Sequence, residues 1–529
     1  MTDTMDIYAK RALEECNSDT HTVRRGGTCG RPFWNINSTQ FTFVPQFSFP
    51  DVPGATSYVY TATDSEGNTH TFEDATTVAP LTPIWKDIAV GLVTLRVDAV
   101  HASGKTYPTG LRSFYKMAPF PGRAALPPRA CSYKECARLA FRYVFEDPTT
   151  RYWLEHGKPD PDYYHNVYPS KTISSVINAM LAYASLEPAD AADARRLAVN
   201  AADYLISLTY GEGYALEGLP PTYSFLGLNK KIVDDNAPAA GRRQHQLMVI
   251  YPATVGQAYL WLEKVTGDSK YFEAAQKIAE FYSVNVLPNG SWYLLMDAKT
   301  GEVESNNCCV QFEPLNFLHA YYHRTGEERF HTLECNYYNY LVKTCLENYN
   351  WEGQFEDVSL ADYYSNLTHF SADEMIGYIS KNLSDDPAMM KEAEELMRFV
   401  EDQFVVWDKH ADWGLFLREN GHKKREDAHW FAPAGLEQYR WYVPIDGSTA
   451  TIMRAFLDLY SATKDPLLLE KAKALGDSIT RMQNPKSGVI PTHWMAKDCA
   501  ENLFNFWINC HIGTAFQMLH LARITGEMN

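Results

Sequence analysis

Basic residues are scarce in this chain relative to acidic ones. The sequence holds 48 Lys and Arg residues against 65 Asp and Glu residues, which gives a formal net charge of −17 over 529 residues. Such a chain offers no basic stripe to neutralise phosphates, which argues against nucleic acid or an anionic membrane as a partner. No apolar run approaches the roughly 20 residues that a membrane-spanning helix needs, and the first residues lack the charged start and apolar stretch of a secretory signal. We therefore expect a soluble protein of the cytoplasm or periplasm.

Signatures of metals, disulfides and cofactors are also missing. The ten cysteines form no C-x-x-C pair and no other spacing typical of a metal or disulfide framework. The adjacent Cys308 and Cys309, with Glu313 close by, are the exception, because they resemble the zinc cluster of neighbouring cysteines and a glutamate in an α/α-barrel arabinofuranosidase family; a zinc site is therefore the alternative to two free thiols. Because no third cysteine stands at a recognisable spacing, free thiols are favoured. Phosphate-binding glycine loops and nucleotide fingerprints are absent as well, so the sequence predicts no metal and no cofactor.

Helix-like segments follow one another from about residue 131 to the end of the sequence. Each shows apolar residues at helical spacing and a recognisable stop signal. The twelve predicted helices span 132–145, 168–186, 189–210, 251–266, 269–287, 312–325, 328–349, 368–383, 387–407, 448–463, 466–483 and 505–525.

The connections between these helices alternate in length. Short breaks such as 266–268 and 325–327 follow the even-numbered helices, whereas the connections after the odd-numbered helices are long and rich in Trp, Tyr, Gly and Pro. The even-numbered helices are apolar around most of their circumference, as an inner ring requires, and the odd-numbered ones keep a charged stripe. A regular array of this kind forms one cooperative unit. We predict a mainly α fold, an (α/α)6 toroid of six helical hairpins over residues 128–529, with a pocket on the side of the long loops.

The sequence before the toroid has a different character. Residues 40–117 alternate in short β-prone runs such as SYVYTAT and GLVTLRVDAVHA, separated by turn signals at 64–68 and 103–105. These runs predict a small antiparallel β-sandwich that resembles a fibronectin type III or immunoglobulin-like module. The Pro-rich stretch 118–129 reads as a stiff linker. We therefore expect two parts, with the N-terminal segment, sandwich and linker in 1–127 and the toroid in 128–529.

Aromatic and polar residues gather where the long loops should meet the inner helices. Carbohydrate recognition needs this mixture, because flat rings stack on the apolar faces of a sugar and planar polar groups bind its hydroxyls. Arginines in these loops of an acidic protein also suit a sugar carboxylate. The candidates for binding substrate are His165, Tyr168, Arg242, Arg243, His245, Tyr251, Arg440, Trp441, His493, Trp494 and Trp507.

Carboxyl groups at the same positions are the candidates for acid and base catalysis. Glu313 lies between Phe312 and Pro314 at the start of an apolar helix, where desolvation raises a carboxyl pKa against the helix dipole, so it is the candidate acid. The other catalytic candidates are Glu356 and Asp357 in the polar run GQFEDV as base or nucleophile, with His369 and Asp446 in reserve.

Each candidate also has a structural explanation. Trp and Tyr can simply fill a wide toroid, lone histidines are usually structural, and Arg242 with Arg243 fits a solvated loop pair. Asp446, before Gly447, suits a helix cap, and Glu313 suits a first-turn acid. Glu356 and Asp357 have the weakest structural explanation, which raises their rank as catalytic candidates.

Six helical hairpins, aromatic long loops and recurrent Thr-Gly turns resemble the α/α-toroid carbohydrate enzymes. A small β module ahead of a single toroid is most similar to the gut-bacterial β-glucuronidases of glycoside hydrolase family 154. The resemblance implies a hydrolase acting on a uronic-acid-containing glycan or a β-glucuronide, and it transfers no residue roles, because no diagnostic catalytic motif is present. A uronate polysaccharide lyase with a His or Tyr base and a non-catalytic glycan-binding protein are the alternatives. The many carboxylates favour the hydrolase, while the sugar, the linkage, the retaining or inverting outcome and a homo-oligomeric state stay open.

Overall fold

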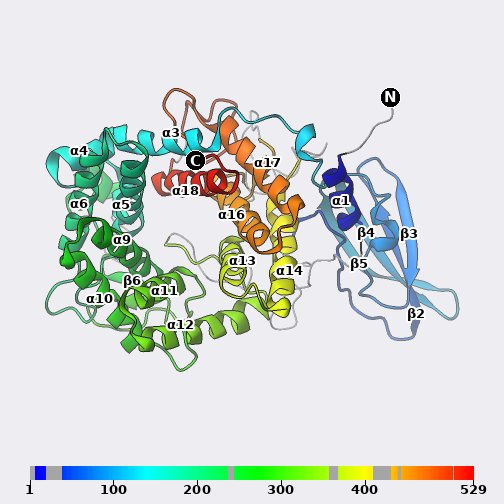
Figure 1. Cartoon of the computed structure of the whole chain (residues 1–529). Coiled ribbons are helices and arrows are strands. Elements are labelled where there is room, and N and C mark those ends of the chain that lie inside the picture. The colour runs from blue at the N-terminus through cyan, green and yellow to red at the C-terminus, as the bar shows by residue number, and fades with distance from the viewer. Residues whose placement is uncertain are drawn as a thin grey trace.

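A β-rich module and a ring of helices make up the computed structural model (Figure 1). It describes residues 6–18, 38–235, 243–356, 367–408, 431–438, 443–503 and 506–528. Helices dominate the described residues, so the predicted mainly α class is confirmed.

All twelve predicted helices are present, with ends that differ by a few residues. They are α3 (Tyr133–Glu146), α5 (Pro169–Leu186), α6 (Ala191–Ser207), α9 (Ile250–Thr266), α10 (Ser269–Val284), α11 (Glu313–Thr325), α12 (Glu328–Leu341), α13 (Phe370–Asn382), α14 (Pro387–Phe404), α16 (Asp446–Thr463), α17 (Pro466–Met482) and α18 (Ile508–Ile524). The sequence reading missed the short helices α4 (Pro148–His156) and α7 (Lys230–Asp235), the 3-10 turns η3 (Arg123–Ala125) and η4 (Tyr164–Val167), and the π-helical turn η5 (Val342–Leu346) that extends α12.

Local chemistry sets the short turns between paired helices. Gly267 and Gly326 end α9 and α11 in the left-handed conformation, with φ of 73° at each, which only glycine adopts without strain. The Asp268 and Asp465 side chains then accept hydrogen bonds from the first turns of α10 and α17. These caps explain why the breaks were readable from the sequence.

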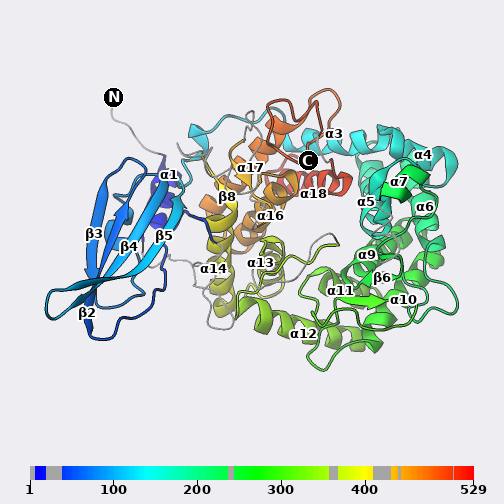
Figure 2. The ribbon, with the colours of Figure 1, turned by 180° about the vertical axis from the view of Figure 1, so that it is seen from behind.

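Helices pack as pairs that are arranged in a ring (Figures 1 and 2). The pairs are α5 with α6, α9 with α10, α11 with α12, α13 with α14, α16 with α17, and the last helix α18 with the first, α3. Around the inside, α5 contacts α9 and α18, α9 contacts α11, and α16 contacts α13 and α18. Asn316 of α11 donates to Glu374 of α13 at 3.2 Å. The inner helices approach closely where side chains are small, since a Cβ on Gly256 of α9 would lie 2.4 Å from the Phe317 ring of α11.

The N-terminal module is built on one sheet. Its strands β1 (Gln40–Phe41), β2 (Ala55–Thr63), β3 (Thr69–Asp74), β4 (Gly91–His101) and β5 (Thr106–Lys116) lie in the order β1-β5-β4-β2-β3, and β1 is parallel to β5. The short helices α1 (Ile7–Cys16) and α2 (Thr82–Trp85) accompany the sheet. Two short two-stranded sheets elsewhere pair β6 (Gln246–Met248) with β7 (Leu295–Asp297) and β8 (Val405–Val406) with β9 (Ala434–Gly435).

This module differs from the two-layer sandwich that its sequence predicted, because the described strands form a single sheet. The buried face is covered by an irregular segment and by the short helix α2, as Phe47 of the first and Trp85 of the second pack on Phe114 of β5 with ring centroids 5.2 and 6.2 Å away. Prolines at 45, 50, 80 and 83 interrupt these segments, and proline cannot donate to a strand ladder. The segments around Phe47 and Trp85 therefore cover the sheet as a loop and a short helix, and not as strands of a second sheet.

Buried hydrogen bonds attach the module to the outer helix α14. The Asp402 carboxylate accepts the backbone N–H groups of Thr42 at 2.6 Å and Phe43 at 2.8 Å, and Gln403 donates to the Gln40 carbonyl at 3.0 Å. Burial raises the pKa of Asp402 to about 7, although the N–H groups and Gln403 oppose that rise. The module therefore depends on an acceptor at position 402.

Replacing Asp402 with Ala should lower the free energy of unfolding. Two buried N–H groups would lose their acceptor, and such a loss costs about 2 kcal/mol or more. Asp402→Asn is the matched control, because its amide oxygen can still accept from Thr42 or Phe43 and should retain most of the stability. Urea denaturation of the full chain measures both variants, and equal stabilities for Ala and Asn would contradict this role.

Candidate functional site

A buried carboxylate, Glu356, joins two inner helices where the long loops enter the ring. Lys171 of α5 donates to Oε1 at 2.7 Å, and the hydroxyl of Tyr251 of α9 donates to Oε2. Tyr223 holds the same residue by donating to its backbone carbonyl at 2.6 Å. Burial by itself raises the pKa of Glu356, but the charge and hydrogen bond of Lys171 and the Tyr251 hydroxyl outweigh it, so the pKa is lowered. Glu356 is thus an ionised group whose oxygens are already occupied.

An aromatic platform lies beside Lys171. The His165 ring stacks on Trp507 with centroids 3.9 Å apart and planes inclined by 13°, and the Lys171 ammonium lies 4.9 Å from the Trp507 ring centroid. Tyr168, the residue before α5, contacts both Trp507 and Tyr223 with centroids 6.0 and 5.8 Å away. Burial lowers the pKa of His165 to about 4, and the Lys171 charge adds to the effect. A neutral imidazole and an indole therefore form one stacked pair at neutral pH.

Glu313, the first residue of α11, lies within reach of the same lysine charge. Burial raises its pKa to about 7, and the charge of Glu374 adds to the rise, while the Glu313 backbone N–H, Lys171 and Arg454 oppose it. By solvent exposure the Glu313 residue is half-buried, and the surrounding ring desolvates its carboxyl group. A carboxyl with this pKa holds its proton for much of the neutral range and can deliver it.

A second ion pair is connected to α11, the helix that begins with Glu313. Arg454 of α16 forms an ion pair with Glu374 of α13 at 2.7 Å, and Asn316 donates to the other Glu374 oxygen. The Glu374 side chain is 32% exposed, in contrast to 0% for Glu356. Glu374 is therefore the more accessible of the two charged carboxylates near Glu313.

Several predicted residues lie in settings that suit structural roles. His369 is fully buried and bonded to Asp373 at 2.7 Å. Asp446 is fully buried as well, with Oδ1 accepting from the Gly447 N–H at 2.7 Å and Oδ2 from Thr514 at 3.2 Å, and burial raises its pKa well above the usual range. Trp494 is fully buried with its indole N–H bonded to the Pro491 carbonyl at 2.9 Å.

The remaining predicted residues divide between the site and its surroundings. Arg243 lies with its guanidinium carbon 5.4 Å from the centroid of the Tyr223 ring, which connects it to Glu356 through Tyr223. His245 instead packs against Tyr214, with ring centroids 5.5 Å apart, next to β6. The backbone of His493 forms an isolated antiparallel β-bridge with Ile445, the residue that precedes α16. Asp357, Arg242, Arg440 and Trp441 lie outside the described residues.

The structure thus brings five predicted residues together, namely His165, Tyr168, Tyr251, Glu356 and Trp507. The charge of Lys171, which pairs with Glu356, also acts on Glu313. Sequence reasoning missed Lys171, Tyr223, Glu374 and Arg454. The available signal was a lone charge in an apolar helix, since Lys171 is the single charged residue of α5. Such a residue must find a partner when its helix is buried on two sides.

Another buried carboxyl, Glu352, lies on the same long loop as Glu356. Burial raises its pKa to about 7, and its backbone carbonyl accepts from Gln311 at 2.9 Å. The Cys309 side chain is fully buried, and its Sγ accepts a hydrogen bond from the Tyr337 hydroxyl at 3.3 Å.

Among the residues that the structure describes, no group of three or more His, Cys, Asp or Glu side chains could hold a metal ion.

The described helices include none that combines the length and apolar character needed to cross a membrane.

Comparison with known proteins gave no matching family model and no matching curated protein. Among solved structures, a family 76 glycoside hydrolase from a bovine Bacteroides thetaiotaomicron strain is 11% identical, with 91% of this chain and 96% of that chain covered and a TM-score of 0.44.

Two further solved structures of other activities are similarly distant. The cellobiose 2-epimerase of Spirochaeta thermophila DSM 6192 is 12% identical, with 75% of this chain and 98% of that chain covered and a TM-score of 0.48. A polysaccharide lyase is 10% identical, with 91% of this chain and 64% of that chain covered and a TM-score of 0.43. With every TM-score below 0.5, none of these likenesses bears on the activity of this chain.

Proposed function

We propose that this chain is a glycoside hydrolase built on an (α/α)6 toroid, acting on a uronic-acid-containing glycan or a β-glucuronide. The observation that carries the proposal is the contrast between Glu313 and its neighbours. The pKa of Glu313 is raised to about 7 by burial, while Glu374, whose charge adds to that rise, forms an ion pair with Arg454. Hydrolysis of a glycosidic bond needs this combination of one protonated and one ionised carboxyl.

In the proposed mechanism Glu313 donates its proton to the leaving glycosidic oxygen. Glu374, the more exposed carboxylate, acts as the base that activates water or as the nucleophile. Glu356 was the base that the sequence favoured, but its side chain is buried and its two oxygens are bonded to Lys171 and Tyr251. We assign it a positioning role, in which it fixes the lysine beside the Trp507 ring.

The preference for an acidic sugar rests on Lys171 and Arg243. The Lys171 ammonium lies 4.9 Å from the centroid of the Trp507 ring, which His165 covers on one face, and a sugar at the edge of this platform could present a carboxylate to the lysine. A lyase would instead need a base beside the uronate. Tyr251 donates its proton to Glu356, and the pKa of His165 is lowered to about 4, so neither is well suited to remove a proton at neutral pH.

A panel of aryl glycosides and uronate glycans tests the proposed function. On the glycans, hydrolysis releases reducing ends without a new ultraviolet absorbance, lysis creates an absorbing double bond, and a binding protein yields neither. On the aryl glycosides, release of the aryl alcohol reports hydrolysis. Cleavage of uronides alone is expected. Equal cleavage of neutral hexosides would end the uronide assignment, and a new ultraviolet absorbance from a glycan would replace the hydrolase with the lyase.

Replacing Arg243 with Ala should weaken uronide turnover. The guanidinium packs on Tyr223. Loss of its charged hydrogen bond to the substrate should weaken transition-state binding by about 1 to 3 kcal/mol, which is measured as a lower kcat/KM. Arg195→Ala on the outer helix α6 is the matched control. The variant would count against the role if its kcat/KM on an aryl uronide equalled that of the control.

A further inference from the structure

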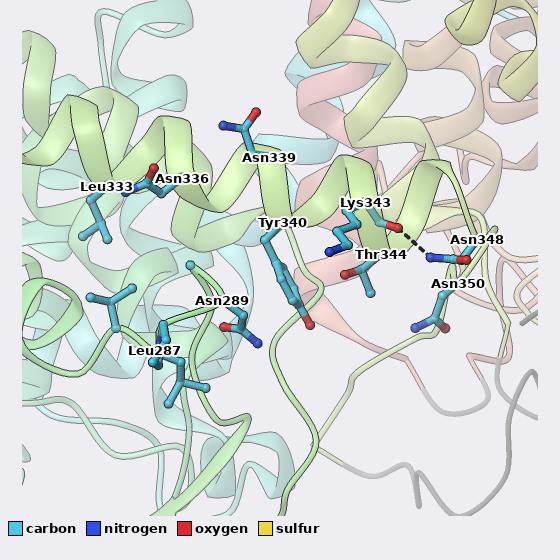
Figure 3. Close-up of a pocket in the computed structure, with 13 residues that line it drawn as sticks. Leu287, Asn289, Leu333, Asn336, Asn339, Tyr340, Lys343, Thr344, Asn348 and Asn350 are labelled. Atoms are coloured by element: carbon cyan, nitrogen blue, oxygen red, sulfur yellow. Dashed lines mark hydrogen bonds between the residues drawn. The ribbon is translucent and has the colours of Figure 1, made fainter.

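A cavity of about 690 Å³ opens between the long connections that follow α10 and α12, apart from the residues around Glu313 (Figure 3). Five asparagines contribute to its lining, namely Asn289, Asn336, Asn339, Asn348 and Asn350. Tyr340 and Lys343 of the same helical segment line it as well, and none of its lining residues is Asp or Glu. For a chain with a net charge of −17, a cavity with a lysine and no acid is a local reversal of charge.

The side chains are arranged around an aromatic ring. In Figure 3 the Tyr340 ring lies between Asn289 and Asn350, with Lys343 and Thr344 one turn further along the helix. Asn348 donates to the Lys343 carbonyl at 2.6 Å, which closes the end of the cavity. In the part of the chain that the structure describes, Asn336, Asn339 and Asn350 show no side-chain hydrogen bond to another residue, so their amides are available to a ligand.

The backbone around the cavity is specialised. Gly290 has a φ of +90°, and a Cβ there would lie 2.8 Å from the Asn336 carbonyl oxygen, so only glycine permits this close approach. The π-helical turn η5 carries Lys343 and Thr344, and π-turns frequently occur at functional sites. Tyr349, between two lining asparagines, has a φ of 53°, an uncommon conformation for a bulky residue that the surrounding structure must hold in place.

Planar amides around a partly exposed aromatic ring are the chemistry of sugar recognition. Amide groups both donate to and accept from hydroxyls, and a tyrosine ring offers a face for the apolar side of a pyranose. Lys343, with no acid among the other lining residues, adds a partner for a carboxylate. A hydroxyl-rich ligand with a negative charge fits all three features, whereas an apolar ligand would leave the amides unpaired.

The cavity also connects to the candidate site through one loop. Asn348 and Asn350 line the cavity, and the same loop continues to Glu356. Gln354 braces the loop between them, since it accepts from the Val310 N–H at 2.9 Å and donates to the Cys308 carbonyl at 2.8 Å. One braced loop therefore runs from the cavity to the site.

We propose that this cavity is a second saccharide-binding site, which holds a distal uronic-acid-containing part of the same glycan. The inference rests on the proposed function for the identity of the sugar. Lys343 binds the carboxylate of the held residue, the Tyr340 ring stacks on it, and the asparagines bind its hydroxyls.

Calorimetric titration of the full chain with hyaluronan hexasaccharide, which carries glucuronic acid, tests the proposal. Its carboxyl-reduced counterpart has the same size without charge. Tyr340→Ala and Lys343→Ala should weaken binding of the charged hexasaccharide at least about tenfold, and the reduced hexasaccharide should bind weakly to every form. Lys391→Ala on α14 is the matched control for the lost lysine, and Tyr340→Phe, which keeps the ring, should bind as the unmodified chain does.

Turnover of a small aryl glucuronide, which is too short to reach the cavity, separates this proposal from the proposed function. Both cavity variants should turn it over normally. If the unmodified chain does not cleave it, the proposed function fails while the titration still decides the cavity. Equal hexasaccharide affinity in Lys343→Ala, Tyr340→Ala and Lys391→Ala, or no binding to the unmodified chain, overturns the second site.

Discussion

Glu313→Gln should lower turnover of a glycan with a poor leaving group by about a hundredfold or more, because loss of a general acid commonly has an effect of this size. The amide keeps the shape of the side chain but cannot deliver a proton. Burial raises the pKa of Glu313 to about 7, so turnover by the unmodified chain should fall as the pH rises through about 7 and the acid loses its proton. The variant should lack this alkaline limb.

Leaving-group dependence gives the sharper test of the acid role. An activated aryl uronide needs little protonation of its leaving oxygen, so it should restore much of the lost rate in Glu313→Gln. Glu302→Gln, an exposed exchange of the same kind, is the control and should behave as the unmodified chain. Near-normal rates for Glu313→Gln on the poor leaving group would transfer the acid role to another carboxyl, of which Glu352 is the next candidate, since burial raises its pKa to about 7.

Lys171→Met should destabilise the fold by about 3 to 5 kcal/mol at neutral pH, because it leaves the fully buried Glu356 carboxylate without its counter-charge. The Tyr251 hydroxyl alone cannot replace an ammonium at 2.7 Å. Turnover of uronides should fall as well, since the same lysine is proposed to meet the sugar carboxylate.

The pH dependence of this loss has a definite sign. The pKa of Glu356 is lowered in the folded chain, so its pairing contributes stability above the unfolded pKa of about 4.3 and loses it as the pH falls through the folded value. In Lys171→Met, burial would raise that pKa instead, and the folded variant would favour the protonated acid. The difference in free energy of unfolding between the unmodified chain and Lys171→Met should therefore be largest near pH 7 and should shrink as the pH falls towards 4.

A double variant separates charge from packing. Adding Glu356→Gln to Lys171→Met removes the stranded carboxylate and should recover most of the stability at pH 7, as measured by urea denaturation. Uronide turnover should stay low, because the lysine is still missing. A double variant no more stable than Lys171→Met would show that the lysine acts through packing and not through Glu356.

The sequence alone determined the helical array, and the reason is local. Helix ends are set by neighbours in the chain, such as Gly267 with Asp268, and by apolar spacing along each segment. The same reasoning found the β-prone runs of the N-terminal module, because alternation is local too. It predicted two facing sheets, however, and whether a covering segment becomes a strand or a loop depends on how it packs against the first sheet.

Site residues at helix starts were predictable to a similar extent. Tyr251, Glu313 and Trp507 could be found because aromatic or acidic residues at the end of a long loop stand out from the apolar helix that follows. The raised pKa of Glu313 followed from its apolar neighbours in the chain. The residues that were missed, Lys171 and Arg454, lie within helices, and each forms an ion pair with a residue distant in the sequence, on a loop for Lys171 and on α13 for Arg454.

Tertiary structure decided which charges meet. Lys171 and Glu356 are 185 residues apart in the sequence, yet they form one buried pair. Arg454 and Glu374 similarly join α16 to α13. No local pattern specifies such pairs, because the energy that makes a buried charge tolerable comes from a partner brought near by the closure of the ring. The division between the buried Glu356 and the accessible Glu374 therefore follows from the packing of the inner helices, whereas the positions of those helices along the chain were already set by the sequence.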